Sequence, residues 1–276
     1  MKRPFALLFV SLPVVVWIAS GSKRPSPSPV PAARAGTLEV VSLNMAKERN
    51  VSTVLRDLNA TPRVRTADIL LLQEVASEPN NPSVAEQLAT NLGFSVFFAP
   101  AGPKTFDQGL AILSRYPLSG SSVLSLKNYD LKFHSRRRFA ISATVDTPSG
   151  SVRIWDAHLD TRLNARQRAD QLAPVIQDAS RFTGPRLIGG DFNTNEFNWI
   201  GHVIPSLGGP SHAETIRQEM LVHGFRSPFP DHLITFPAYR RHLDWIFGSN
   251  VRAIDSTAEP MLFSDHNAVS ARFAFE

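Results

Sequence analysis

From Thr37 to the end of the chain, short apolar runs of strand length alternate with longer stretches of helical periodicity, and no second linker interrupts them. This alternation predicts a single domain in which strands and helices pack in layers. The apolar runs indicate nine buried strands, at Leu38–Leu43, Ile69–Gln73, Ser95–Ala99, Leu110–Leu113, Phe139–Val145, Val152–Ala157, Leu187–Gly189, Leu243–Phe247 and Ala268–Phe273. Helical periodicity falls at Thr53–Leu58, Ser83–Leu92 and Arg166–Arg181. Because this is too many strands for one small sheet, two packed sheets with flanking helices are expected.

The beginning of the chain has a different character. Lys2 and Arg3 precede an apolar run from Phe5 to Ala19, which is shorter than the roughly 20 apolar residues that a bilayer span needs. We therefore interpret residues 1–21 as a signal peptide, with an uncleaved N-terminal membrane anchor as the alternative. Residues 22–36, rich in proline and serine, are expected to form an extended linker ahead of a domain at residues 37–276. The protein is thus expected to be exported, either secreted or periplasmic, or anchored to the membrane by its N-terminus.

The charge of the chain is concentrated in this leader. The whole sequence carries 29 basic and 24 acidic residues, and five of the basic residues but no acidic ones lie in residues 1–35. The remainder therefore holds 24 of each sign, so net charge alone gives no support for nucleic-acid binding by the domain. The sequence has no cysteine, which excludes disulfides, thiolate nucleophiles and cysteine-ligated zinc. Any chemistry must use Asp, Glu, His, Ser or a bound metal.

Polar side chains fall repeatedly at the edges of the predicted strands. Such residues are Asn44, Glu74, His158, the pair Asp191 and Asn193, and Asp265 with His266. Taken singly, each has an ordinary explanation as a solvated strand end, a turn residue or a buried core histidine. Side chains at strand ends of layered α/β proteins converge on one rim, however, and a rim bearing these groups is suited to a hard cation.

Seven short motifs occur in an order and at spacings that resemble one known family. They are Val41–Asn44, Leu71–Val75, Gly109–Pro117, Ala157–Asp160, Gly190–Thr194, His242–Ile246 and Ser264–His266. On these motifs the sequence resembles the endonuclease/exonuclease/phosphatase family of metal-dependent phosphodiesterases over nearly all of residues 38–275. The resemblance implies an α/β fold, a four-layered sandwich of two mixed β-sheets flanked by helices. It also implies a hydrolase of phosphodiester bonds that uses Mg²⁺, with Mn²⁺ as an alternative.

The resemblance further implies a specific role for each of these residues. Asn44, Glu74 and Asp265 are the expected metal ligands, since Mg²⁺ is usually bound by one or two carboxylates with further oxygen ligands. Asp191 is expected to orient or deprotonate the attacking water, and Asn193 to donate a hydrogen bond to a phosphate oxygen. His266 is expected to stabilise the transition state, with Asp244 fixing its imidazole, and His158 to face the phosphate or the leaving group.

Several neighbouring groups have ordinary structural explanations. A solvated loop and helix start is favoured for Asp160, Arg162 and Arg166, although an arginine could hold phosphate. His242 is expected to face solvent. The basic residues Arg136–Arg138 fit either a substrate contact or a charged sheet edge.

The substrate is left open between two enzymatic alternatives. A nuclease is favoured. Within the family, His158 resembles the histidine of the deoxyribonuclease and sphingomyelinase branches, and it disfavours the abasic-site endonucleases, which lack a histidine at this position. A sphingomyelinase-like or inositol-phosphate phosphatase activity on lipid head groups is the alternative, for which a loop with Phe225, Phe229 and Phe236 is a faint indication. A non-enzymatic binding module is disfavoured because Glu74, Asp191 and His266 are all present. The expected partner is a phosphodiester substrate, nucleic acid ahead of phospholipid, with possible membrane association through the N-terminus, and we expect a monomer.

Overall fold

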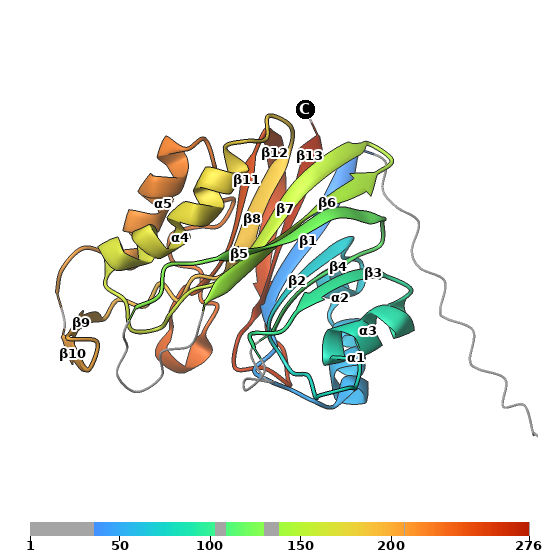
Figure 1. Cartoon of the computed structure of the whole chain (residues 1–276), viewed down its shortest axis with the longest axis horizontal. Helices are drawn as coiled ribbons and strands as arrows, with labels where there is room; N and C mark the ends of the chain where they lie inside the picture. Colours follow the sequence, from blue (N-terminus) through green and yellow to red (C-terminus); the bar gives the residue numbers. More distant parts are fainter. Residues whose placement is uncertain (1–35, 103–108, 130–137, 207, 276) are drawn as a thin grey trace, which may run out of the picture.

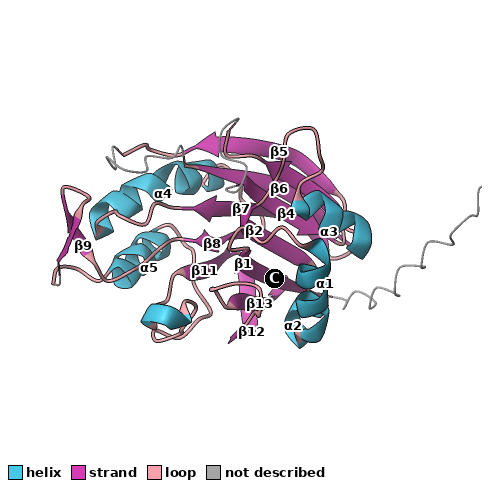
Figure 2. Ribbon diagram, turned by 90° about the horizontal axis from the view of Figure 1, so that it is seen from below, coloured by secondary structure: helices cyan, strands magenta, loops and turns pink. Residues whose placement is uncertain are grey.

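The structure is a computed structural model that describes residues 36–102, 109–129, 138–206 and 208–275. Within these residues two large β-sheets pack face to face, with helices on both outer faces (Figures 1 and 2). This four-layered α/β arrangement confirms the predicted fold. The predicted leader, and all of the predicted linker except Gly36, lie outside the described residues. No helix in the described part is both long and apolar enough to cross a bilayer.

The first sheet contains the N-terminal and C-terminal strands of the domain. Its strand order is β12 (Val251–Glu259), β13 (Ala268–Phe275), β1 (Thr37–Asn44), β2 (Ile69–Val75), β4 (Gly109–Ser114) and β3 (Ser95–Ala99). Strands β1 and β2 are parallel, and the other neighbours are antiparallel. The sheet is therefore mixed.

The second sheet is also mixed. Its strand order is β11 (Asp244–Ser249), β8 (Arg186–Asp191), β7 (Gly150–His158), β6 (Phe139–Thr147) and β5 (Leu118–Ser125). Strands β7 and β8 are its parallel pair. A separate two-stranded hairpin follows β8 and consists of β9 (Asn198–Ile200) and β10 (Ile204–Ser206).

Alternation along the strands builds three apolar layers. Val40 and Leu71 of the first sheet belong to the central core between the sheets, as does Ile154 of the second sheet. Their sequence neighbours Val41 and Leu72 instead pack under the helices on the outer face. Because successive side chains of a strand point to opposite faces, runs that are apolar at every position are buried on both sides.

Helices cover the two outer faces separately. The first sheet is covered by α1 (Val51–Ala60), α2 (Pro62–Arg65) and α3 (Val84–Leu92), and the second by α4 (Ala165–Ala179) and α5 (His212–Val222). A short 3-10 turn, η1 (Pro237–Tyr239), lies in the segment before β11. Each α-helix turns an apolar stripe to its sheet.

Some elements escaped prediction. Strands β5 and β12 were missed because they lie at sheet edges and are largely exposed or half-buried, so their sequences lack a continuous apolar run. The hairpin strands, α2 and α5 were missed as well, since the strands are three residues long, α2 has four residues and α5 has a weak apolar stripe.

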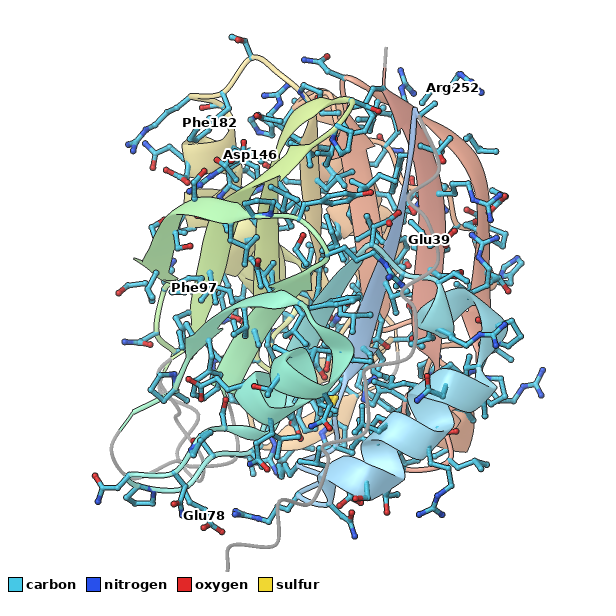
Figure 3. The ribbon with its side chains drawn as sticks, turned by 90° about the vertical axis from the view of Figure 1, so that its right-hand side faces the viewer. Glu39, Glu78, Phe97, Asp146, Phe182 and Arg252 are labelled. Carbon is cyan, nitrogen blue, oxygen red and sulfur yellow. The ribbon has the colours of Figure 1, made fainter. Side chains whose placement is uncertain are left out.

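Charged residues also stabilise the end of the first sheet where β1 begins. Glu39, labelled in Figure 3, is 5% exposed and accepts hydrogen bonds from Arg63 at 2.9 Å and Arg272 at 3.1 Å. Burial raises the pKa of Glu39 although both arginines oppose this effect. This network ties α2 to β1 and β13, at the opposite end of β1 from Asn44.

Candidate active site

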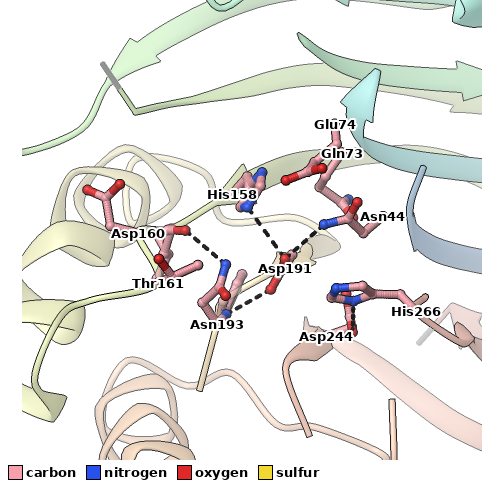
Figure 4. Close-up of polar contacts among 12 residues, drawn as sticks. Asn44, Gln73, Glu74, His158, Asp160, Thr161, Asp191, Asn193, Asp244 and His266 are labelled. Carbon is pink, nitrogen blue, oxygen red and sulfur yellow. Dashed lines mark hydrogen bonds and ion pairs between the residues drawn. The ribbon is translucent and has the colours of Figure 1, made fainter. Parts of the chain in front are cut away.

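The predicted polar residues meet at one edge of the sandwich, where strands from both sheets end (Figure 4). Asn44, His158 and Asp191 are the last residues of β1, β7 and β8, and Glu74 is the penultimate residue of β2. Asp244 is the first residue of β11, an antiparallel neighbour, and so reaches the same edge. His158 and Asp244 are the register partners of Asp191 on either side.

Asp191 is the centre of the hydrogen-bond network. Its Oδ1 accepts from the backbone N–H of Asn193 at 2.9 Å, and its Oδ2 accepts from Asn44 Nδ2 at 3.0 Å. His158 Nε2 lies 3.4 Å from the same Oδ2. The Asn44 contact links the first sheet to the second. Burial, followed by the nearby Asp244 carboxylate, raises the pKa of Asp191 to about 7, although His266 and the hydrogen bonds from Asn193 and Asn44 act in the opposite direction.

A glycine directly before Asp191 allows this placement. Gly190 has a φ of 134°, and a Cβ at this position would overlap the carbonyl oxygen of Ala157 on β7. A larger residue would therefore push β8 away from β7 and displace Asp191 from His158. The Gly-Asp order in the motif thus has a steric reason.

Glu74 lies on an irregularity in β2. Its φ is 50°, a left-handed conformation that is uncommon for a residue other than glycine, asparagine or aspartate. The pairing of β2 with β4 shifts register between Leu72 and Val75, which places Glu74 in a bulge. Lys47 Nζ lies 3.8 Å from Glu74 Oε2. Because of the bulge, the Glu74 carboxylate lies in the cavity wall and does not follow the regular alternation of side chains between the two faces of the sheet.

His266 and Asp244 form a buried ion pair. His266 Nδ1 donates to Asp244 Oδ2 at 2.8 Å, and the two side chains are 7% and 0% exposed. Burial opposes a charge on His266, but the carboxylates of Asp244, Asp191 and Asp265, with Asp244 contributing most, together outweigh burial and raise the pKa of His266 to about 10. Asp191, Asp244 and His266 have donor atoms within 4.8 Å of one another. A protonated imidazole already bonded to a carboxylate does not bind a cation, so we interpret this group as a hydrogen-bonded pair beside Asp191 and not as the metal site.

One cavity of about 450 Å³ contains almost all of these groups. Its lining includes seven of the eight predicted site residues, Asn44, Glu74, His158, Asp191, Asn193, Asp265 and His266. The eighth, Asp244, is fully buried behind His266.

The predicted metal ligands fit a hard divalent cation. Glu74 is partly exposed and Asp265 exposed, so both carboxylates are accessible in the cavity. The Asn44 amide oxygen accepts a hydrogen bond from Ala46 N at 3.0 Å and has a second lone pair. Two carboxylates, one amide oxygen and open space for water form the type of donor set that Mg²⁺ takes.

Other residues fix the loops that follow β7 and β8. Asn193, at a φ of 50°, donates from Nδ2 to the Leu159 carbonyl at 3.0 Å. Arg168 of α4, which has no exposed surface, donates to the carbonyls of Asp160 at 2.6 Å and Phe192 at 2.9 Å. Sequence reasoning missed Arg168, because an arginine on a helix is normally taken to face solvent.

Two ordinary interpretations of neighbouring residues are wrong. Asp160 is 2% exposed and accepts from Arg138 at 2.8 Å and from Gln171 Nε2 at 2.8 Å, so it is not part of a solvated loop. His242 is 7% exposed, and its ring stacks on Trp245 at 3.7 Å, so it does not face solvent.

For the remaining residues the outcome is mixed. Arg166 is exposed, as expected, whereas Arg162 is half-buried and lines the cavity. Arg136 and Arg137 lie outside the described residues. Phe225 and Phe229 are 1% and 3% exposed, so they belong to the core and not to an apolar surface loop.

A two-sheet α/β sandwich with carboxylates, amides and two histidines at one edge, each histidine beside a carboxylate, is the type of site that suits a metal-assisted hydrolase of phosphate esters. The sequence agrees with this class: residues 41–266 match the family model described as Endonuclease/Exonuclease/phosphatase family. The chain therefore belongs to that family, whose members are typically metal-dependent hydrolases. No curated protein matches the sequence.

Solved structures agree in fold at low sequence identity. An endonuclease/exonuclease/phosphatase from Beutenbergia cavernae DSM 12333 has 18% identity and a TM-score of 0.65, over 87% of this chain and 72% of that chain. A family protein from Leptotrichia buccalis C-1013-b has 15% identity and a TM-score of 0.64, over 86% and 100%. The human Nocturnin catalytic domain with a bound sulfate anion has 20% identity and a TM-score of 0.63, over 88% and 95%.

Proposed function

We propose that the protein is a divalent-metal-dependent phosphodiesterase, and that its substrate is nucleic acid. The observation that carries this proposal is the single cavity lined by Asn44, Glu74, His158, Asp191, Asn193, Asp265 and His266. These residues come from distant segments, and together they supply a cation site, a base and hydrogen-bond donors around one tetrahedral anion. The sulfate in the human Nocturnin domain, which is similar in fold, has the same tetrahedral shape as phosphate.

In the proposed mechanism Asp191 removes a proton from the attacking water. Its raised pKa suits a base that works near neutral pH. Asn193 uses one amide proton on Leu159 O and keeps the other for a phosphate oxygen. Asp244 occupies Nδ1 of His266, so the Nε2–H of the imidazolium is left to donate to the developing charge on phosphate. Mg²⁺ or Mn²⁺ bound by Asn44, Glu74 and Asp265 would neutralise phosphate charge.

Nucleic acid is the favoured substrate because the cavity combines positive charge with aromatic side chains. Arg162 and Arg241 line it together with Phe197 and Trp199. Arginine guanidinium groups pair with phosphate, and aromatic rings stack on nucleobases.

A lipid head group is the second candidate, and one observation favours it. The β9–β10 hairpin has exposed apolar side chains, Ile200 at 63%, Val203 at 40% and Ile204 at 58%. Exposed apolar residues beside an active site are suited to contact with a lipid surface.

One assay tests both candidates. The full-length protein is given bis(p-nitrophenyl) phosphate, plasmid DNA, RNA, sphingomyelin vesicles and a phosphoinositide with Mg²⁺ or Mn²⁺. We expect hydrolysis of the first substrate and of a nucleic acid, loss of both with chelator, and loss of at least about 100-fold in Asp191→Asn and His266→Ala. Unchanged turnover in both variants would show that the assigned roles are wrong.

We also propose that the protein is exported. The support is the sequence of residues 1–21, with its basic start and short apolar run. The test is the mass and location of the mature chain in its native host. A cleaved, soluble product supports the signal peptide, a membrane-bound product of full mass supports the anchor, and a full-length cytoplasmic product contradicts export.

A further inference from the structure

Beyond the catalytic residues, the cavity is bounded by an aromatic wall, which we define as Phe197 and Trp199. Both belong to the segment around the β9–β10 hairpin, which none of the sequence motifs includes. Each ring has an arginine over it. The Arg162 guanidinium lies 5.6 Å from the centre of the Trp199 ring, and that of Arg241 lies 5.3 Å from the centre of the Phe197 ring.

The aromatic wall is held in place by the loop that follows His158. Asn164 accepts from Trp199 N at 2.5 Å and donates to Trp199 O at 3.2 Å. His202 Nδ1 donates to the carbonyl of Arg162 at 2.7 Å, and Asn195 Nδ2 donates to Thr161 O at 2.8 Å. These contacts fix the hairpin relative to the catalytic edge, so the wall is a preorganised surface.

Two hydrogen-bond donors, one on the aromatic wall and one on the arginine over Phe197, lack an acceptor. Trp199 Nε1 and Arg241 Nε are shielded from water and have no hydrogen-bond partner among the described residues. The other two described tryptophans are satisfied, since Trp155 donates to Asp178 at 3.0 Å and Trp245 to Thr194 at 2.9 Å. A buried donor without an acceptor costs free energy, so the hydrogen bonding of these two side chains is incomplete among the described residues.

We propose that the aromatic wall and its two arginines form a subsite for the nucleotide next to the scissile phosphate, and that it takes this nucleotide from a single strand. This inference rests on the proposed phosphodiesterase function. An unpaired base presents a flat face to Trp199 or Phe197, while its phosphate accepts from Arg162 and Arg241.

The aromatic rings and arginines together favour an unpaired nucleotide over other phosphodiesters. In a duplex the base faces are covered by their neighbours and cannot stack on a protein ring. A choline head group has no acceptor oxygens of its own beyond the single phosphate, and an inositol phosphate has no aromatic face. A volume of about 450 Å³ lies in the range of pockets for small molecules and not of grooves for a double helix.

The test measures binding, so that it does not depend on turnover. Full-length Asp191→Asn protein is titrated against a fluorescein-labelled ten-nucleotide oligothymidylate and a duplex of the same length, with anisotropy as the readout. In this background Trp199→Ala should weaken binding of the single strand by about tenfold or more. Arg162→Ala should weaken it and reduce the slope of log K against log salt by about 0.7.

Each variant has a matched control close by in the sequence. Ile200 neighbours Trp199 on β9 but is 63% exposed and does not line the cavity, and Arg166 is an exposed arginine four residues beyond Arg162. Ile200→Ala and Arg166→Ala should bind within about twofold of the parent, since they remove no stacking or phosphate contact. If Trp199→Ala unfolds, Trp199→Phe keeps an aromatic face and should bind more tightly than Trp199→Leu.

Three results would overturn the proposal. The first is equal binding by Trp199→Ala and Ile200→Ala, and the second is equal salt slopes for Arg162→Ala and Arg166→Ala. The third is a Trp199→Ala defect that appears with sphingomyelin vesicles and not with oligothymidylate. Failure of the proposed function itself would appear separately, as absence of bis(p-nitrophenyl) phosphate hydrolysis by the unmodified protein.

Discussion

At the scale of single residues, Glu74 combines a functional side chain with a strained backbone. Its φ of 50° and the bulge in β2 place it at the cavity wall. Such conformations cost about 1–3 kcal/mol and persist where the surrounding structure imposes them. The strain is therefore an expected cost of presenting a carboxylate from the interior of a buried strand.

Relief of this strain is measurable. Glu74→Asn should raise the free energy of unfolding by about 0.5–1 kcal/mol in the presence of chelator, because asparagine tolerates the left-handed region. The control is Glu74→Gln, which removes the charge but keeps an unfavourable conformation. Urea unfolding of both variants is the measurement, and both should lose metal-dependent hydrolysis. Equal stability of the two variants would contradict strain at this position.

The Asp244–His266 pair makes a second prediction. Asp244→Asn leaves the shape of the side chain but removes the carboxylate that holds Nδ1 of His266, so the imidazole loses both its orientation and its charge. We expect kcat to fall by about 10²–10⁴-fold with a smaller change in KM. Asp170→Asn, the same exchange at an exposed carboxylate on α4, is the control. A loss confined to KM would mean that Asp244 contributes to substrate binding instead.

At the scale of elements, prediction succeeded for strands whose sequence is a continuous apolar run. Strand β3 was predicted with its observed bounds, and β7 is longer than predicted by three residues in total. Strands buried on both faces carry an apolar signal at every position, whereas the exposed edges β5 and β12 carry little. The bulge at Glu74 could not be predicted, since it depends on the pairing of β2 with β4.

Helix α4 has a function that its amphipathic pattern does not indicate. Its Arg168 is fully buried and bonds to carbonyls in both catalytic loops, including that of Phe192 between Asp191 and Asn193. Gln171, one turn later, donates to Asp160. The helix thus sets the distance between the loop after β7 and the loop after β8.

This positioning can be tested by removing the planar donor group. Arg168→Lys keeps the charge but cannot reach several carbonyls at once, so the free energy of unfolding should fall by about 2–4 kcal/mol. At a temperature where the variant is folded, kcat should fall more than KM rises. Arg166→Lys on the exposed face is the control and should change neither quantity. Normal stability of Arg168→Lys would contradict the role of these buried hydrogen bonds.

At the scale of the whole molecule, the site exists because two mixed sheets present strand ends at a common edge. The sequence predicted which side chains gather there, because each lies at the edge of an apolar run within a recognisable motif. It did not predict the groups whose positions depend on packing of remote segments. Trp199 lies at the cavity because the β9–β10 hairpin is bonded to Asn164. Arg168 lies behind the catalytic loops because α4 packs on the second sheet.

Buried neutral histidines give the molecule a characteristic acid sensitivity. Burial lowers the pKa of His242 to about 3, although its Nε2 donates to the Asp244 carbonyl at 3.1 Å, and burial lowers the pKa of His212 to about 4. An unfolded histidine titrates near pH 6.5, so between about pH 6.5 and pH 3 the unfolded chain binds protons that the native chain does not. The contribution of these two histidines to stability therefore falls as the pH falls through this window.

Comparison with a variant isolates the contribution of His242 from that of the carboxylates. From pH 7 to pH 5, His242 alone should remove about 1–2 kcal/mol from the free energy of unfolding of the unmodified protein. His242→Gln keeps an amide donor near the Asp244 carbonyl but has no titrating group, so its stability should decline less over the same range. Urea unfolding at half-unit pH steps gives the difference. Parallel curves for the two proteins would mean that His242 is protonated in the native state, and that its stacking on Trp245 tolerates a charge.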